Sequence, residues 1–355
     1  MLNSIIRIMA TAAGCALLLA GCSLRLDDPA SELTPNDGEA ITFDAGPSLL
    51  RDDVISTKAY PGSFTSFGVF AFIQTNNGNW GWTSWTPNLM YNQEVSVSGA
   101  TYNANGVANV SEATFSYTPT TYWPAPGNKA SFWAYSPYDA NASLLQRGKF
   151  STYTAATKGI PDIRFTVTNG KTDLMVSNMV QNKTAATCTP AGVVNFTFRH
   201  VLSWVDFVIQ KLDDDNDNFT VNLTSISFEN VYLTGICRNG NASPSWAGWS
   251  GQRSSLPVFS GTREVTPSAV TLSDYSVMPL PQTLVDSEAR MRVAYTLENQ
   301  TEGISESNVY TFPITADWEL GKHYTYTIQI KPDWPIKFTI SWVDWGADHT
   351  IDLAD

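Results

Sequence analysis

The chain is short of charged residues, cysteine and histidine, and each shortage narrows what it can be. Charged residues make up 15% of its 355 residues and hydrophobic residues 43%, so wholesale disorder is excluded and a large core can form. Acidic residues outnumber basic ones, which gives a formal net charge of −12, and the chain has no basic cluster. Phosphate backbones repel such a chain, which excludes nucleic acid as a partner.

Catalytic and metal-binding motifs are missing as well. His200, His323 and His349 stand in no zinc-binding spacing, and the chain has no GxSxG, P-loop or GxGxxG sequence. His200 lies at the end of a segment in which apolar and polar residues alternate, and His323 lies at the start of another. Such positions are typical of structural histidines. No two of the many acidic residues are marked as a catalytic pair. We therefore predict no enzyme activity, no cofactor and no metal.

The densest acidic run, DDDNDN, begins like a calcium-binding loop. Asp213, Asp215 and Asp217 match the first three ligand positions of such a loop. Asn218 then replaces the glycine that the loop needs, and Thr224 replaces its bidentate glutamate. A solvated loop between two strands is the preferred interpretation, and a calcium site is the alternative.

Cysteine is scarce outside the first residues of the chain. Of the four cysteines, Cys15 and Cys22 lie at the N-terminus, which leaves Cys188 and Cys237. Two cysteines in a chain of this length are not a disulfide framework. They either form one bridge outside the cytoplasm or pack as small apolar side chains, and both interpretations stay open.

Residues 1–21 have the pattern of a bacterial lipoprotein signal peptide. Arg7 supplies a positive charge, and the apolar run 8–19 is too short to span a bilayer as a helix. The sequence LAGC that ends at Cys22 resembles the lipobox, in which the cysteine becomes the acylated first residue. Because no other run is long and apolar enough to cross a membrane, we predict that acyl chains such as palmitate on Cys22 anchor the protein.

Residues 22–39 are polar and acidic, as expected of a flexible tether. Asp27 and Asp28, soon after the predicted lipid-bearing cysteine, resemble the surface-export signal of Bacteroidetes lipoproteins. Leader and tether together predict a surface-exposed position on the outer membrane.

The rest of the chain has the pattern of strands separated by turns. Short apolar-rich runs are bounded by Gly, Pro, Asn or Asp, and no window shows a helical stripe. Apolar and polar residues alternate in 41–43, 194–198, 205–209, 291–297, 324–330 and 336–342, whereas 67–73 and 131–135 are continuous runs typical of buried strands. This pattern predicts an all-β fold of antiparallel sandwiches. A polar segment at 178–192 divides it into predicted domains over 40–185 and 186–355.

Tryptophan gathers in two turn-rich segments. Trp80, Trp82 and Trp85 lie in one of them, and Trp246 and Trp249 lie in the other. Exposed indole faces can stack on sugar rings, so these residues are candidate glycan contacts. Packing over the ends of a sandwich is the favoured interpretation, because tryptophan is usually largely buried.

Four segments, in this order along the chain, resemble motifs of the fimbrillin family of Bacteroidetes. They are WP at 123–124 followed by ASFWAYSP at 130–137, DLM at 173–175 followed by VNFTFRHVLS at 194–203, MPLPQTL at 278–284, and WELGKHYTY at 318–326. Together they cover nearly the whole chain after the leader, and the lipobox and acidic tether fit the same family.

The resemblance implies two tandem transthyretin-like antiparallel β-sandwich domains in a structural or accessory subunit of an adhesive surface fimbria. Its partners would be other fimbrial subunits, the outer membrane through the lipid, and a glycan or protein on a host or bacterial surface. Stalk, tip and anchor roles stay open. The alternative function is a surface glycan-binding lipoprotein of a nutrient-uptake system.

The resemblance also implies polymerisation by strand exchange, in which an Arg-specific protease removes the N-terminal strand and a neighbour's strand fills the groove. The strand to be removed would carry Ile41 and Phe43, with the cut after Arg51. Residues 57–59 are Thr-Lys-Ala where the family is expected to have Thr-Arg-Ala. Arg51 is therefore the expected site, unless the chain stays uncut as an anchor, tip or accessory subunit.

The candidate donor is the last alternating run of the chain. Its residues Ile336, Phe338, Ile340 and Trp342 would point to one face of a strand. The same run is equally well interpreted as the last strand of its own domain.

Overall fold

The computed structural model describes residues 35–47, 64–102, 108–109, 113–147, 151–212, 218–239, 243–285, 288–299, 301–331 and 336–344. Nearly all regular structure in these ranges is β-strand, and the helical turns within them are the short η1 (Ala185–Thr187) and η2 (Ser273–Tyr275). The predicted all-β class is confirmed. Across the same ranges no helix is long and apolar enough to cross a membrane.

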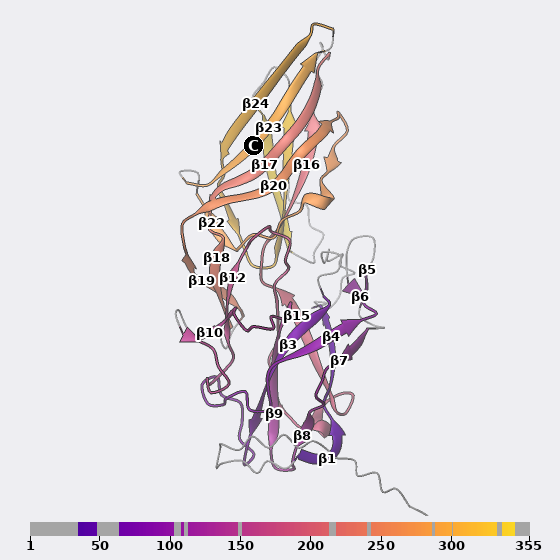
Figure 1. The fold of residues 1–355 in the computed structure, drawn as a ribbon, viewed down its shortest axis with the longest axis vertical. Helices are drawn as coiled ribbons and strands as arrows, with labels where there is room; N and C mark the ends of the chain where they lie inside the picture. Colours follow the sequence, from indigo (N-terminus) through magenta and orange to yellow (C-terminus); the bar gives the residue numbers. More distant parts are fainter. Residues whose placement is uncertain are drawn as a thin grey trace, which may run out of the picture. The chain divides into compact units, whose positions relative to one another are not determined.

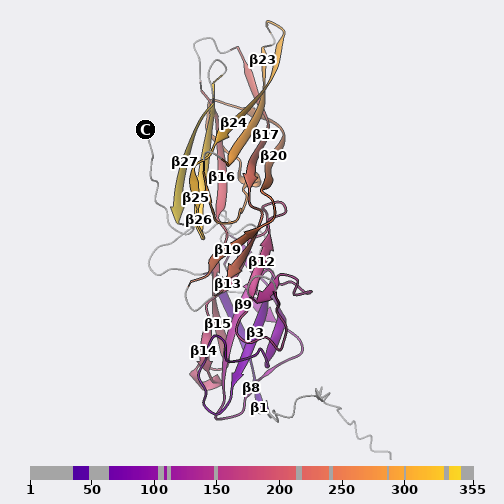
Figure 2. The ribbon, with the colours of Figure 1, turned by 90° about the vertical axis from the view of Figure 1, so that its left-hand side faces the viewer.

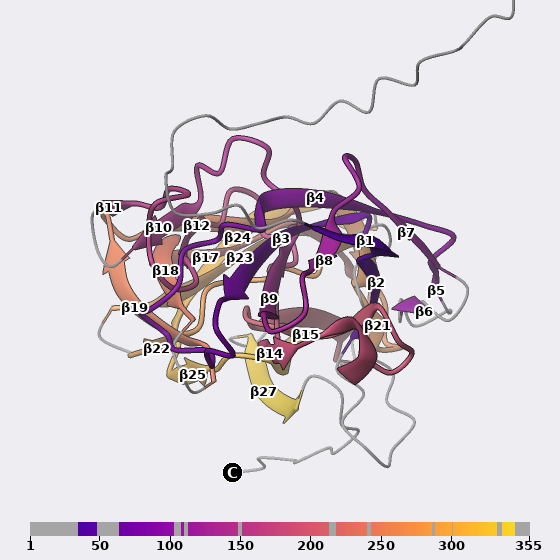
Figure 3. The ribbon, with the colours of Figure 1, turned by 90° about the horizontal axis from the view of Figure 1, so that it is seen from below.

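An eight-stranded sheet carries most of the first half of the chain (Figure 1). Its order is β2 (Thr42–Pro47), β15 (Val193–His200), β13 (Met175–Ser177), β9 (Lys129–Ser136), β3 (Ser66–Gln74), β4 (Met90–Ser98) and β7 (Thr114–Ser116), with β14 (Val180–Lys183) also paired to β9. Its neighbours pair antiparallel except β2, which runs parallel to β15. The sheet curls, so that its two edges, β2 and β7, contact each other (Figure 3).

The inside of this curled sheet is filled by aromatic and aliphatic side chains. Because successive side chains of a strand point to opposite faces, β9 sends Phe132 into this core and Trp133 to the other face. A short ribbon of β1 (Pro35–Ala40) and β8 (Tyr122–Pro124) adjoins the sheet. The predicted tether over 22–39 therefore ends in a strand, since residues 35–39 belong to β1.

A second sheet joins segments from both halves of the sequence. Its order is β11 (Ser151–Thr152), β10 (Leu145–Arg147), β12 (Asp162–Thr166), β18 (Thr234–Arg238) and β19 (Ser245–Ser250). β12 and β18 pair antiparallel from Ile163 opposite Cys237 to Thr166 opposite Thr234. The strands on either side of the predicted boundary thus share one hydrogen-bonded sheet.

The last part of the chain forms two facing sheets (Figure 2). One has the order β21 (Val270–Thr271), β16 (Trp204–Lys211), β26 (Lys322–Ile330) and β27 (Lys337–Asp344), and the other the order β20 (Ser254–Val265), β17 (Thr220–Val231), β23 (Arg290–Asn299) and β24 (Ile304–Pro313). Phe228 of β17 lies 5.7 Å from Phe207 of β16 and 5.4 Å from Tyr326 of β26, measured between ring centroids. These contacts join the two layers as a sandwich.

Two small ribbons complete the described strands. They are β22 (Gln282–Leu284) with β25 (Ala316–Trp318), and β5 (Thr101–Tyr102) with β6 (Ala108–Asn109). Pro35–Asp355 groups as one compact unit. β15 follows the predicted boundary at 185/186 yet belongs to the eight-stranded sheet, so the chain leaves that sheet after His200. The division into domains over 40–185 and 186–355 stays a prediction.

The two described cysteines are buried and unbridged. Cys188 lies in the core of the curled sheet, and Cys237 lies in the larger core shared by the other sheets. Of the two interpretations that the sequence left open, the structure favours packing as small apolar side chains.

Candidate functional site

The N-terminal strand β2 occupies an edge position in the curled sheet. Ile41, just before β2, and Phe43 within it are 1% and 6% exposed. The Phe43 ring stacks on Phe196 of β15 at 5.8 Å and meets Tyr117, just beyond β7, edge-on at 5.3 Å. β2 thus fills the apolar gap between the two ends of the curled sheet.

Backbone and side-chain hydrogen bonds hold this segment in the gap. The Ile41 N–H donates to the Thr121 carbonyl at 2.9 Å, and the Tyr117 hydroxyl donates to the Ile41 carbonyl at 2.8 Å. The Thr42 N–H donates to the Gly192 carbonyl at 3.2 Å. Full burial of one Ile or Phe side chain contributes about 1.5–3 kcal/mol. Removal of this segment would therefore expose both apolar surface and unpaired backbone groups.

The C-terminal strand β27 is also an edge strand. It pairs antiparallel with β26 from Lys337 opposite Gln329 to Asp344 opposite Lys322. Ile336, just before it, is 5% exposed. Ile340 and Trp342 are half-buried against the larger core, while the side chain of Phe338 lies outside the described residues. The donor candidates with described side chains pack in the larger core, whereas Ile41 and Phe43 pack in the core of the curled sheet.

The tryptophans of the 80–85 segment are half-buried. The Trp80 ring packs edge-on against Phe72 at 4.7 Å and lies 6.1 Å from the Trp82 ring. Trp85 donates through Nε1 to the Asn79 carbonyl at 3.0 Å. These rings and bonds make the segment a packed loop and leave part of each ring accessible.

Trp246 and Trp249 lie on β19, in the five-stranded sheet. Trp246 is half-buried and donates through Nε1 to the Val201 carbonyl. Trp249 is 43% exposed and donates to the Pro281 carbonyl at 3.2 Å. Glycan contact at any of the five tryptophans stays a prediction.

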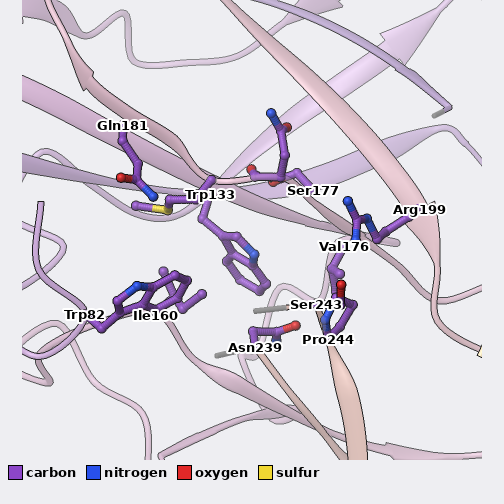
Figure 4. A pocket seen from close by; sticks show the side chains of 12 residues that line it. Trp82, Trp133, Ile160, Val176, Ser177, Gln181, Arg199, Asn239, Ser243 and Pro244 are labelled. Atoms are coloured by element: carbon purple, nitrogen blue, oxygen red, sulfur yellow. The ribbon is translucent and has the colours of Figure 1, made fainter. Parts of the chain in front are cut away.

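A pocket of about 300 Å³ opens beside Trp82 (Figure 4). Its lining comes from strands β9, β13, β14 and β15, from the loops before β4 and β12 and between β13 and β14, and from the residues between β18 and β19. The lining residues include Trp82, Trp133, Asn178, Gln181, Arg199 and Ser243. Only Trp82 was a sequence candidate, because the other residues come from separate strands and share no local motif.

Two histidine–aspartate pairs lie among the buried polar groups. His200 Nδ1 lies 2.8 Å from Oδ2 of the buried Asp173, and His323 Nε2 lies 2.9 Å from Oδ2 of the buried Asp206. Both contacts are those of structural histidines.

Among the residues that the structure describes, no group of three His, Cys, Asp or Glu side chains could hold a metal ion. The acidic run at 213–217, with its calcium alternative, lies outside the described residues.

The fimbrillin-like family model matches residues 57–345. The chain belongs to the fimbrillin-like family. The resemblance found in the sequence motifs is thereby confirmed. Fimbrium subunit Fim1C of Phocaeicola vulgatus is 27% identical over 220 residues, which cover 59% of this chain and 52% of that protein. The chain thus spans about half the length of this relative.

Two solved structures share the fold of this fimbrillin-like chain. A fimbrial protein from Bacteroides vulgatus has a TM-score of 0.58 at 18% identity, covering 87% of this chain and 100% of its own. A putative cell adhesion protein from Bacteroides uniformis has a TM-score of 0.50 at 16% identity, covering 88% of this chain and 99% of its own. At these identities the likeness concerns the fold alone.

Two predicted sites of this fimbrillin-like chain lie outside the described residues. They are the lipidation residue Cys22 and the cleavage residue Arg51. Arg51 follows β2 in the sequence, between that strand and β3.

Proposed function

We propose that this protein is a structural or accessory subunit of a cell-surface fimbria, assembled by exchange of terminal strands. Membership of the fimbrillin-like family supports the proposal, as does the similarity to a fimbrium subunit. In this role the protein is a building unit with no catalytic turnover. Its partners are other fimbrial subunits.

The observation that carries the proposal is the position of β2. This strand pairs with one neighbour, β15, and its apolar side chains close the gap in the curled sheet. A strand at an edge can leave without breaking the pairing of the strands behind it. The groove it leaves then selects a replacement strand with apolar residues at every second position.

The proposed release step is a cut after Arg51. Such a cut separates β1 and β2 from the chain that continues into β3, so only noncovalent contacts then hold them. β27 is the proposed donor, because it also pairs with one neighbour and its Ile340 and Trp342 pack against the larger core. In this scheme β27 of one subunit leaves β26 and pairs with β15 of the next.

The leader sequence supports a location on the cell surface. We infer that Cys22 is acylated in the precursor and holds it on the outer membrane before the cut. After the cut, the part of the subunit that enters the fimbria has lost both the lipid and β2. Adhesion to a host or bacterial surface is the proposed purpose of the assembled fimbria.

An Arg-specific protease applied to the purified precursor tests the proposal. We expect a new N-terminus at residue 52 by mass spectrometry, followed by a ladder of oligomers in size-exclusion chromatography. Arg51→Ala should abolish both results, whereas the matched Lys58→Ala should abolish neither. A cut precursor that stays monomeric, or oligomers that form equally well in Arg51→Ala, would contradict the scheme.

A further inference from the structure

The pocket beside Trp82 is preformed, because hydrogen bonds fix the loops of its wall. The Gly159 N–H donates to the Trp85 carbonyl at 2.8 Å, which joins the 154–160 loop to the tryptophan loop. Arg147 donates through Nη1 to the carbonyl of Ile160 at 3.0 Å, next to the Trp82 wall. A preformed pocket loses little conformational entropy when a ligand binds.

A buried indole points into this pocket. Trp133 of β9 is only 2% exposed, and Figure 4 shows its ring projecting between Trp82 on one side and Arg199 on the other. Trp133 Nε1 donates no hydrogen bond to the described residues, and it is not among their fully buried unpartnered atoms. An N–H at the wall of a pocket without a protein partner is available to an acceptor on a ligand.

The rim of the pocket carries one cation and several unused polar groups. Arg199 is exposed, and its guanidinium makes no ion pair with the described residues. This is unusual in a chain with a net charge of −12, in which acidic partners are plentiful. The side chains of Gln181 and Ser243 likewise have no hydrogen-bond partner in the ranges that the structure describes. Asn178 receives the Thr197 N–H on Oδ1 at 2.9 Å and keeps its amide hydrogens for a ligand.

We propose that this pocket binds one saccharide ring that carries a carboxylate, such as a uronic or sialic acid residue of a surface glycan. The half-buried indole of Trp82 suits the apolar face of a sugar ring, and the Trp133 N–H suits a ring or hydroxyl oxygen. Gln181, Asn178 and Ser243 suit its hydroxyl groups, and the guanidinium of Arg199 suits the carboxylate. A volume of about 300 Å³ holds a single ring, at the lower end of ligand pockets.

This binding site is independent of strand exchange. None of the lining residues lies on β1, β2 or β27. A monomer that never assembles therefore still has the pocket, and failure of assembly is distinguishable from failure of binding. If the pocket binds as proposed, it supplies the adhesive contact of the fimbria or the function of a surface glycan-binding lipoprotein.

Isothermal titration of the mature full-length protein tests the proposal. The probes are D-glucuronic acid and N-acetylneuraminic acid, with D-glucose as the uncharged control. We expect saturable binding of at least one acidic sugar, about tenfold or more tighter than glucose, since charge-assisted hydrogen bonds are the stronger ones. Whichever acid binds identifies the sugar class.

Matched variants assign the binding to the pocket. Arg199→Gln should lower the affinity for the acidic sugar about tenfold or more and leave the affinity for glucose unchanged. Arg263→Gln changes an exposed arginine on β20 and should alter neither affinity. Trp82→Ala should lower the affinity for both sugars. Circular dichroism checks that each variant is folded. The proposal is wrong if neither acid binds saturably, or if binding survives both Arg199→Gln and Trp82→Ala.

Discussion

Asp206 is a buried carboxylate that three side chains hold in its charged form. It is 4% exposed and accepts hydrogen bonds from Trp204 Nε1 at 2.8 Å, from His323 Nε2 at 2.9 Å and from the Ser276 hydroxyl. Burial alone raises the pKa of a carboxyl, but the hydrogen bonds and charge of His323, with the bonds from Ser276 and Trp204, outweigh it. The pKa of Asp206 is therefore lower than its ordinary value.

Asp206→Asn should destabilise the protein at neutral pH and have less effect in acid. Because the folded-state pKa is lowered, this carboxylate stabilises the fold above its unfolded pKa of about 4, and that contribution is lost as the pH falls through the folded value. We expect the variant to unfold about 1–3 kcal/mol more easily at pH 7. Urea unfolding at pH 7 and pH 3 measures the difference.

Glu302→Gln is the matched control for this variant. Because Glu302 is exposed, its substitution should leave the free energy of unfolding nearly unchanged. A gap between wild type and Asp206→Asn that stays constant from pH 7 to pH 3 would contradict the assigned role.

At the scale of elements, β2 and β27 occupy the edge positions that the proposed strand exchange requires. β2 and β27 each have one paired neighbour in their sheets, while β15 and β26 beside them have two. The parallel pairing of β2 with β15 is slightly less stable per residue than antiparallel pairing. Side-chain burial therefore contributes much of what keeps β2 in place before any cut.

Phe43→Ala should be strongly destabilising in the uncut protein. The ring is buried among Phe196, Tyr117 and Phe132. Its loss leaves a cavity and should lower the free energy of unfolding by about 3–5 kcal/mol. Asp44→Ala on the same strand changes an exposed side chain and should have little effect. Urea unfolding compares the two, and equal stabilities would show that β2 does not hold the fold together.

At the scale of the whole molecule, the strand pairing links the two halves of the sequence. β12 precedes the predicted boundary and β18 follows it, yet they pair in one sheet. The larger core also contains residues from both halves, from Phe70 to Ile336. A shared core and a shared sheet favour unfolding as one unit.

Differential scanning calorimetry should therefore show a single transition for the uncut protein. The calorimetric enthalpy should equal the van't Hoff enthalpy, as it does for a two-state unit. Two resolved transitions would instead support independent domains on either side of residue 185.

The sequence alone was sufficient for the fold class and for many of its strands. Alternation of apolar and polar residues predicted the strands at 194–198 and 324–330, which are β15 and β26, because period-two burial is a local property of a strand. A continuous apolar run predicted the strand at 67–73, which is β3 and is buried on both faces. β24 was missed, since much of its surface is exposed and its first half is polar.

Which strands pair and where a pocket forms depend on the three-dimensional packing of distant segments. Nothing near Thr42 in the sequence indicates that it lies beside Val193, because pairing depends on the shape and burial of distant segments. The same holds for Trp82, Trp133 and Arg199, which meet at one pocket from three separate elements. Local patterns record which face of a strand is buried, whereas a partner strand and a binding site are properties of residues far apart in the chain.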